Sequence, residues 1–396
     1  MIPALVRFIH PTFVVVVLMS CFAWEASTVH GQTPCPGDLN GNGEVTIDEI
    51  VRAVNSALNG CNQATITDWT VDSSTSVPGL IGSLVVDPAG TFAYISTGSA
   101  LIVVDLNARR ATRIFPVCGS GMSCSVDGVD PSGTLVLLHN FDEAVVIRAA
   151  DGSQVRTAGA GAAGHAAFAN GWVYVPAFNG RALVAQEIQG TQTKTINPYA
   201  GSSGVAGPDF AVASPDGKKV VFDDSFSASI FVVETSTNQI TATIALGFAA
   251  TGAFFRDDST VVVSSPGILE VVDLANPTAI PQVIPVDFLG TPQGSLSSAA
   301  GFNGGLLADG SVTKLVGLHG VSIDGSTSYP TDLEYSLGVI DIQSGIVSEK
   351  ATVNQILQMP SGALPYYPVL ALLPDGNTAL LGLGPTLYFL HLATSF

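Results

Sequence analysis

From residue 64 to residue 396, short apolar segments alternate with polar turns, and most of the apolar segments have the length of a β-strand. The clearest unit is LVVDPAGTFAYISTGSALIVVDLNARRATRI, residues 84–114. The stretch VASPDGKKVVFDDSFSASIFVVETSTNQITATI, residues 212–244, repeats its layout. Each unit consists of a strand, a tight turn and three further strands. The pattern predicts a series of four-stranded antiparallel sheets along the chain.

A turn motif marks each repeat. Pro presets the first dihedral angle of a turn and Gly accepts a positive φ at its end, so such motifs between apolar segments predict hairpins. Successive motifs are separated by 38 to 66 residues, and the shorter spacings match the period of about 40 to 45 residues of one propeller blade. We therefore predict an all-β fold, a seven-bladed β-propeller over residues 64–396. The seven motifs are Pro88-Ala89-Gly90, Pro131-Ser132-Gly133, Ala169-Asn170-Gly171, Pro215-Asp216-Gly217, Asp257-Asp258-Ser259, Ala308-Asp309-Gly310 and Pro374-Asp375-Gly376.

The two ends of the repeat region complement each other. The last repeat has only three predicted strands, whereas residues 64–74, ATITDWTVDSS, form an extra strand before the first full unit. Because a closed ring leaves no open sheet edge, we expect residues 64–74 to close the last blade as its fourth strand. An eight-bladed ring, with another unit within residues 260–375, is the alternative. Seven blades are favoured because residues 321–336 are polar, contain Gly and Pro and read as a loop insertion.

The repeat resembles the YVTN-type repeat of lactonase-like seven-bladed propellers over roughly 330 residues. This resemblance implies a fold far more strongly than a function, because propellers serve many unrelated functions.

Residues 35–61, CPGDLNGNGEVTIDEIVRAVNSALNGC, do not follow the β pattern. Counting from Asp38, oxygen ligands fall at positions one, three, five, seven, nine and twelve, with Gly43 at position six for the sharp bend. The segment TIDEIVRAVNSAL then places apolar residues at helical spacing. The predicted Ca²⁺ ligands are Asp38, Asn40, Asn42, Glu44 through its carbonyl, Thr46 and Glu49.

This segment resembles an EF-hand calcium loop and the loop-helix half of a dockerin repeat. A dockerin has two repeats and usually Asp at position twelve, whereas this chain has one repeat and Glu49. The resemblance therefore implies a structural Ca²⁺ element over residues 32–63 more than a docking module. Only Asp38 and Glu49 bring ligand charge, so we expect a dissociation constant of about 10⁻⁴ to 10⁻³ M. The alternative is a polar turn that caps a helix.

Residues 1–31 have the features of an export signal. Arg7 precedes the apolar stretch TFVVVVLMSCFAW, which has secretory length but is short for a membrane span. The expected location is therefore secreted, periplasmic or on the cell surface, without stable membrane insertion after cleavage. Lipidation at Cys21 and an uncleaved anchor are the alternatives.

The cysteines fit export. With Cys21 removed or acylated, Cys35, Cys61, Cys118 and Cys124 remain, an even number suited to an oxidising compartment. Three pairings are open, and proximity in sequence favours Cys35–Cys61 and Cys118–Cys124; free buried thiols are the alternative. No CxxC motif occurs and no His lies within a few residues of these four, so their spacing does not suit zinc.

Composition and charge narrow the partners. Charged residues make up 12% of the chain, alongside 42 Gly and 23 Pro, which suits strands and turns better than helical bundles. The formal net charge is −18, from 32 acidic and 14 basic residues, without any long basic cluster. Nucleic acid is therefore not an expected partner. We expect a monomer that binds an unknown protein or glycan at one propeller face.

The candidate ligand site lies at the mouth of the predicted channel, among loops from different blades. Its residues are His139, His165, Asp223, Asp224 and His319, beside the 321–336 segment. His391 falls within a predicted strand and is expected to be packed in the core. The Gly-rich stretches 159–166 and 199–207 precede strands, so they are expected to ease crowding near the channel and not to bind phosphate.

No catalytic residue is predicted. The chain contains no GxSxG, HExxH, P-loop or CxxCH motif, so hydrolase, metalloprotease, nucleotide-binding and cytochrome readings lack their usual residues. A binding or scaffolding module is favoured over an enzyme. The alternative is a lactonase-like hydrolase or an accessory protein of extracellular polysaccharide breakdown, which would gather at least three carboxylate or imidazole groups around one ion.

Overall fold

The protein is described from a computed structural model. It covers residues 66–117, 124–140, 142–159, 161, 164–198, 207–224, 228–265, 268–285, 314–322, 333–342, 347–359, 366, 368–375 and 378–394. The chain divides into two units, Met1–Asn62 and Gln63–Phe396. The predicted signal at 1–31, the calcium element at 32–63 and Cys118 lie outside the described residues, so the predicted disulfides and Ca²⁺ ligands stay predictions. Among the described residues, no helix is long and apolar enough to cross a membrane.

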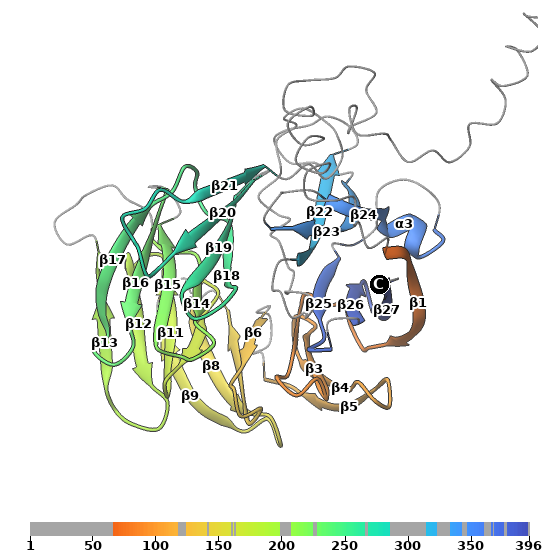
Figure 1. Ribbon diagram of the computed structural model, residues 1–396. Coiled ribbons are helices and arrows are strands. Elements are labelled where there is room, and N and C mark those ends of the chain that lie inside the picture. Colours follow the sequence, from red (N-terminus) through yellow and green to blue (C-terminus); the bar gives the residue numbers. More distant parts are fainter. Residues whose placement is uncertain are drawn as a thin grey trace, which may run out of the picture. The chain divides into compact units, whose positions relative to one another are not determined.

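Antiparallel sheets of four strands follow one another along the second unit (Figure 1). The first blade contains β2 (Ser83–Val86), β3 (Phe92–Ser96), β4 (Leu101–Asp105) and β5 (Arg110–Phe115). The second contains β6 (Ser125–Val129), β7 (Leu135–His139), β8 (Glu143–Arg148) and β9 (Gln154–Gly159). The third contains β10 (Ala167–Ala169), β11 (Trp172–Ala177), β12 (Ala182–Glu187) and β13 (Thr193–Ile196).

The remaining sheets continue this order. The fourth blade contains β14 (Ala211–Ala213), β15 (Lys219–Asp224), β16 (Ser229–Glu234) and β17 (Gln239–Ala245). The fifth contains β18 (Gly252–Phe255), β19 (Thr260–Ser265), β20 (Ile268–Asp273) and β21 (Gln282–Pro285). A three-stranded sheet follows, with β22 (Lys314–Ser322), β23 (Leu333–Asp341) and β24 (Val347–Thr352), and then the short helix α3 (Val353–Ile356). The closing blade contains β25 (Val369–Leu372), β26 (Thr378–Leu383), β27 (Thr386–Thr394) and β1 (Ile66–Ser76).

The blade count corrects the sequence prediction. Seven four-stranded blades were expected, and the described residues form six, with β22, β23 and β24 as a three-stranded sheet. The chain between Pro285 and Lys314, which holds the predicted turn at 308–310, lies outside the described residues. The predicted insertion at 321–336 is also shorter than expected, because β22 extends to Ser322 and β23 begins at Leu333.

The closing blade joins the two ends of the propeller. β1 pairs antiparallel with β27, from Ile66 opposite Thr394 to Ser76 opposite Thr386. This is the pairing expected for residues 64–74 as the fourth strand of the last blade. The unit is therefore closed by hydrogen bonds between strands that are some 300 residues apart in the chain.

The core consists of hydrophobic clusters that each lie between two neighbouring sheets. For example, Tyr94 and Val103 of the first blade pack with Val126 and Val136 of the second. The closing blade packs against the first blade through Phe389 and other apolar residues. Burial of apolar area at about 25 cal/mol per Å² makes these contacts the main stabilising term.

The predicted hairpin turns form as expected where they are described. Gly90, Gly133, Gly171 and Gly217 all have positive φ, between 66° and 77°. At Gly90 the backbone N–H also donates to the Asp87 carbonyl at 2.9 Å. A residue with a side chain would be strained at these positions, so the glycines fix the turns that join the first two strands of the blades.

Candidate functional site

The antiparallel blades give the propeller two different faces. One face, here the turn face, holds the connections from first to second strand and from third to fourth strand of each blade. The opposite face, here the loop face, holds the connections from second to third strand and from one blade to the next. His139 and His165 lie on the loop face, at the end of β7 and just before β10.

Asp127 lies at an irregularity in the innermost strand of the second blade. In the pairing of β6 with β7, Val126 lies opposite Leu138 and Gly128 opposite Leu137, so Asp127 is the extra residue of a β-bulge. A bulge re-aims a side chain that would otherwise follow the strict alternation of the strand. The Asp127 side chain is only 1% exposed, and its Oδ2 accepts a hydrogen bond from the Ala166 N–H at 3.0 Å.

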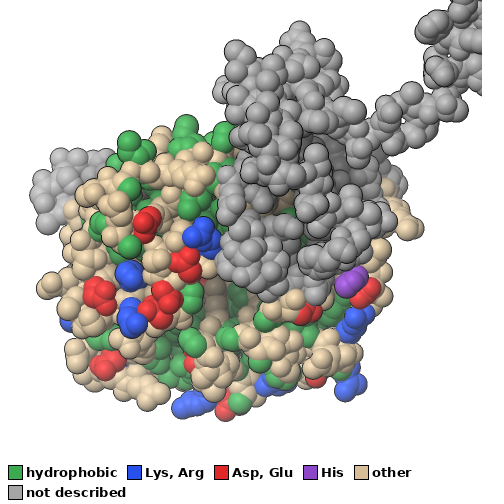
Figure 2. Space-filling model, in the orientation of Figure 1, with side chains coloured by type: hydrophobic (Ala, Val, Ile, Leu, Met, Phe, Trp, Pro, Cys, Tyr) green, Lys and Arg blue, Asp and Glu red, His purple; other side chains and the backbone are tan. Residues whose placement is uncertain are grey.

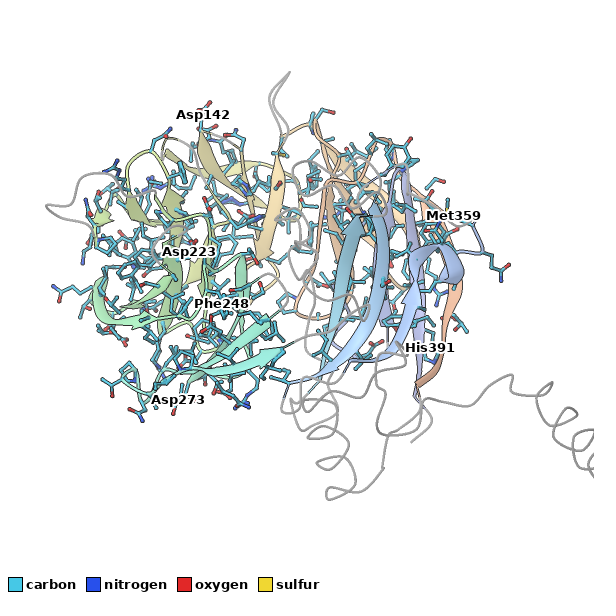
Figure 3. All side chains as sticks on the ribbon, turned by 90° about the horizontal axis from the view of Figure 1, so that it is seen from above. Asp142, Asp223, Phe248, Asp273, Met359 and His391 are labelled. Atoms are coloured by element: carbon cyan, nitrogen blue, oxygen red, sulfur yellow. The ribbon has the colours of Figure 1, made fainter. Side chains whose placement is uncertain are left out.

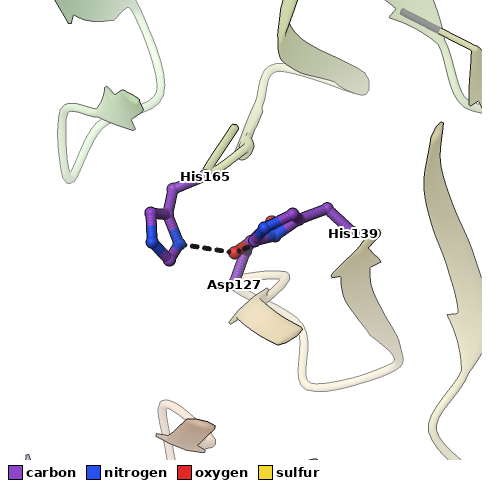
Figure 4. Close-up of side chains that lie close together, drawn as sticks. All are labelled: Asp127, His139 and His165. Atoms are coloured by element: carbon purple, nitrogen blue, oxygen red, sulfur yellow. Dashed lines mark hydrogen bonds and ion pairs between the residues drawn. The ribbon is translucent and has the colours of Figure 1, made fainter. Parts of the chain in front are cut away.

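Two imidazole rings converge on this carboxylate (Figure 4). His139 Nδ1 lies 2.7 Å from both Asp127 oxygens, and His165 Nδ1 lies 3.0 Å from Oδ1. The rings meet edge to face at 75°, with centroids 5.0 Å apart. The His139 side chain is 13% exposed and that of His165 is 68% exposed, so the cluster is open to solvent on the His165 side.

Charge and burial act in opposite directions on these groups. Burial tends to raise the pKa of Asp127, but the charge of His139 and the hydrogen bonds from both rings outweigh it, so the pKa is lowered. The hydrogen bond that His165 donates to Asp127 raises the pKa of His165, and the Asp209 carboxylate adds to this effect. Because His165 is well exposed, solvent screens this shift.

The backbone of His165 is fixed between two blades. Its N–H donates to the Asp209 carbonyl at 3.0 Å, and its carbonyl accepts from the Ala211 N–H at 2.7 Å. Gly164 permits this approach, because a Cβ there would collide with the Asp209 carbonyl. Gly207 likewise lies against the Phe178 backbone. These glycines of the two Gly-rich stretches therefore serve close packing between blades, as expected.

The other predicted site residues have different environments. Asp223 is fully buried in β15 and accepts hydrogen bonds from the Asp209 and Phe210 N–H groups at 2.8 and 3.0 Å. Its second oxygen has no hydrogen-bond partner among the described residues, and burial raises the pKa of Asp223 to about 7. Asp224 is the last residue of β15 and pairs with Ser229, and His319 pairs with Ser336 in β22. Among the side chains that the structure describes, only those of His139 and His165 come together from the predicted set.

His391 is not a core residue, contrary to the sequence prediction. It is exposed in β27, where it lies opposite Thr378, the first residue of β26 (Figure 3). An exposed side chain can hydrogen-bond to solvent, so the apolar residues around His391 in β27 do not imply that it is buried.

Sequence reasoning missed Asp127, the residue that joins the two histidines. Asp127 lies within the strand β6, whereas the candidate residues were sought in loops and at strand ends. The usable signal was Gly128 directly after a charged residue in an otherwise apolar strand, since an isolated Gly in a strand indicates a bulge.

Exposed large apolar side chains also occur on the loop face. Leu80 is 53% exposed, Phe178 37%, Phe248 50% and Tyr366 41%. Leu80, Phe248 and Tyr366 lie in connections between blades, and Phe178 lies between β11 and β12. Three connections between blades and one connection within the third blade thus present an aliphatic or aromatic side chain on the same face as His165.

The turn face carries a different feature, a pocket of about 860 Å³ at the junction of the first three blades. Arg113, Arg148 and Arg156 line it, together with the turns that begin at Asp87 and Pro131. Arg113 donates to the carbonyls of Ala149 and Ala150 at 2.8 and 3.0 Å, and Arg156 donates to the Gly190 carbonyl. Arg113 and Arg156 therefore fasten neighbouring blades to one another.

Comparison with known proteins supports the class that this architecture defines, an all-β propeller. A chain in the crystal structure of the mitotic checkpoint complex is similar to this protein with a TM-score of 0.58 and 10% sequence identity, covering 82% of this chain and 92% of that chain. At this identity the likeness shows the fold alone. No family model matches the sequence, and no curated protein matches it either.

Proposed function

We propose that this protein is an exported, calcium-binding β-propeller that acts as a binding module through its loop face. The observation that carries the proposal is the set of exposed apolar side chains on that face, Leu80, Phe178, Phe248 and Tyr366. Aromatic and large aliphatic side chains are the usual anchors of protein interfaces. A protein partner therefore fits this face better than a glycan.

The proposal includes the features at the N-terminal side of the propeller. Residues 1–31 would direct export, and Ca²⁺ bound by Asp38, Glu49 and the intervening oxygen ligands would order the chain just before β1. A Cys35–Cys61 bridge would staple this small element. Hydrophobic clusters join the three-stranded sheet β22–β24 to the fifth blade and to the closing blade.

Site-specific photo-crosslinking in the cells that produce the protein tests the binding role. A benzophenone side chain replaces Phe248 on the loop face or Ile280, which is 93% exposed between β20 and β21 on the turn face. We expect a discrete crosslinked product from position 248 and none from position 280. The same products from both positions, or none from either, would contradict the proposal.

A hydrolase is the second candidate, and two observations favour it. Asp127, His139 and His165 are three carboxylate and imidazole groups within reach of one ion, as such an enzyme would need. Asp127 accepts a hydrogen bond from His165 Nδ1 and so orients the ring. The ring is exposed, and its Nε2 could act as a general base. Assay of a panel of lactones with wild type and His165→Ala decides between the two. Turnover that His165→Ala abolishes would support the hydrolase, and equal rates in both proteins would reject it.

A further inference from the structure

We propose that Asp127, His139 and His165 form a binding site for a divalent transition-metal ion, with Zn²⁺ as the preferred occupant, at the loop face of the propeller. The proposal does not depend on the binding role above, because it concerns the ion and needs no partner.

The donor atoms are already gathered. One carboxylate oxygen and one ring nitrogen from each histidine all lie within 4.8 Å of one another. They come from three places in the chain, the bulge in β6, the end of β7 and the residue that precedes β10. Three ligand groups on separate elements that converge on one point indicate a constructed site more than a chance contact on a single loop.

The chemistry of the set selects the class of ion. Two imidazole nitrogens with one carboxylate suit Zn²⁺ and its first-row neighbours, whereas Ca²⁺ and Mg²⁺ prefer oxygen ligands alone. The loop of residues 38–49, with oxygen ligands only, and this cluster would therefore select different ions.

The geometry requires only a small adjustment. Ligand atoms in a tetrahedral zinc site are about 3.3 to 3.6 Å apart, given bond lengths of about 2.0 to 2.2 Å. The present separations of 2.7 and 3.0 Å are those of hydrogen bonds, so the rings must move outward by about 0.5 Å. Asp127 is held by the Ala166 N–H, and the exposed ring of His165 has room to move.

The arrangement leaves one coordination position open. Asp127 and His139 close the inner side of the cluster, while the 68% exposed His165 side chain borders solvent. Three protein ligands with a fourth position open are typical of zinc sites that bind a water molecule or an exogenous group. The bound ion would thus be accessible from the loop face.

Zinc titration of the full chain by calorimetry, with Ca²⁺ in excess to saturate oxygen-ligand sites, tests the proposal. We expect one saturable Zn²⁺ site in wild type, with protons released only from rings that are protonated before binding, because a neutral ring shifts its hydrogen from Nδ1 to Nε2 and keeps it. His165→Ala should weaken affinity by at least about 100-fold, since loss of a direct ligand should cost no less than loss of a supporting group. His391→Ala, which removes an exposed histidine on β27, should bind as wild type does.

A second readout keeps the test independent of any folding defect. Co²⁺ in a nitrogen and oxygen site gives visible absorption bands that report coordination directly, and circular dichroism before metal addition establishes that each variant is folded. Asp127→Asn preserves an acceptor for the Ala166 N–H but removes the charge, and it should lose the bands. Absence of a saturable site in wild type, or equal affinity in wild type and His165→Ala, would overturn the proposal.

Discussion

Among the described residues, both faces of the propeller join neighbouring segments through carboxylates that accept from backbone N–H groups, and the turn face adds cations that donate to backbone carbonyls. On the loop face, carboxylates accept hydrogen bonds from backbone N–H groups, as Asp127 does from Ala166 and as Glu270 does from Gly247 and Phe248. On the turn face, cations donate to backbone carbonyls of the next blade, as Arg113 does to Ala149. Figure 2 shows acidic and basic side chains interspersed on one side of the molecule.

This difference explains how a chain with few basic residues uses them. Four of the 14 basic residues each donate a hydrogen bond from one blade to a turn-face carbonyl of the next blade. These four are Arg113, Arg156, Lys194 and Lys219. These four basic groups of the turn face thus help to hold neighbouring blades together. The loop face instead keeps two histidines and a carboxylate in contact with one another, which is why we place the ligand site there.

Two buried carboxylates on the loop face differ in their partners and in their pKa. Asp127 has two histidine partners and a lowered pKa, whereas Asp223 has only backbone partners on one oxygen and a pKa raised to about 7 by burial. Burial alone therefore does not decide the charge of an acid; the availability of a cation does.

The largest expected effect is that of Asp223→Asn. The folded protein holds the proton of Asp223 up to a pH of about 7, while the unfolded chain releases it near 3.8, so wild type loses stability as pH rises through this window. The difference corresponds to at most about 4 kcal/mol at pH 8. Asn keeps the acceptor for Asp209 and Phe210 without a buried charge, so the variant should be the more stable protein above pH 7.

Urea unfolding at pH 4 and pH 8 checks this prediction. Asp142→Asn is the matched control, because Asp142 is exposed on the same face, and its stability should follow wild type at both values (Figure 3). If Asp223→Asn lost stability equally at both pH values, the acid would be charged in the folded protein and the contrast with Asp127 would fail.

The second effect concerns the turn face. Arg113 lies over Phe92 at 5.1 Å and donates to two carbonyls of the second blade, so Arg113→Met should destabilise the protein by about 2 to 3 kcal/mol. Arg113→Lys keeps the charge but lacks the planar fork, and it should lose about half as much. Arg110→Met is the control at an exposed position of the same strand. Chemical unfolding at one pH measures all three, and equal stability of Arg113→Met and Arg110→Met would contradict a fastening role.

Much of the fold could be predicted because its signals are local. Pro or Asn followed by Gly sets a turn within a few residues, and Gly133 and Gly217 indeed have positive φ. The pairing of β1 with β27 could be inferred from an unpaired strand at each end. Beyond Ser259 the turn motifs are 51 and 66 residues apart, so the local period no longer determined how many strands each sheet would contain.

The candidate site depends on contacts that no local pattern encodes. His139 and His165 could be assigned to one face from the order of strands and loops. Their convergence on Asp127 depends on the bulge in β6 and on the parallel bridge that fixes His165 beside Phe210, both of which are tertiary features. The sequence therefore predicts which residues reach the loop face but not which of them touch.

The smallest expected effect is that of replacing an exposed cation on the turn face. It tests whether exposed cations stabilise the protein as much as partly buried ones do. Lys194 is exposed, donates to the Thr237 carbonyl at 3.1 Å and lies 5.9 Å from the Trp172 ring. Solvent competes for its charge, so Lys194→Met should cost only about 0.5 kcal/mol, and Lys194→Arg should be neutral. Thermal unfolding at low and high salt measures the difference, which should shrink with salt. A loss as large as that of Arg113→Met would mean that burial is not what gives the turn-face contacts their strength.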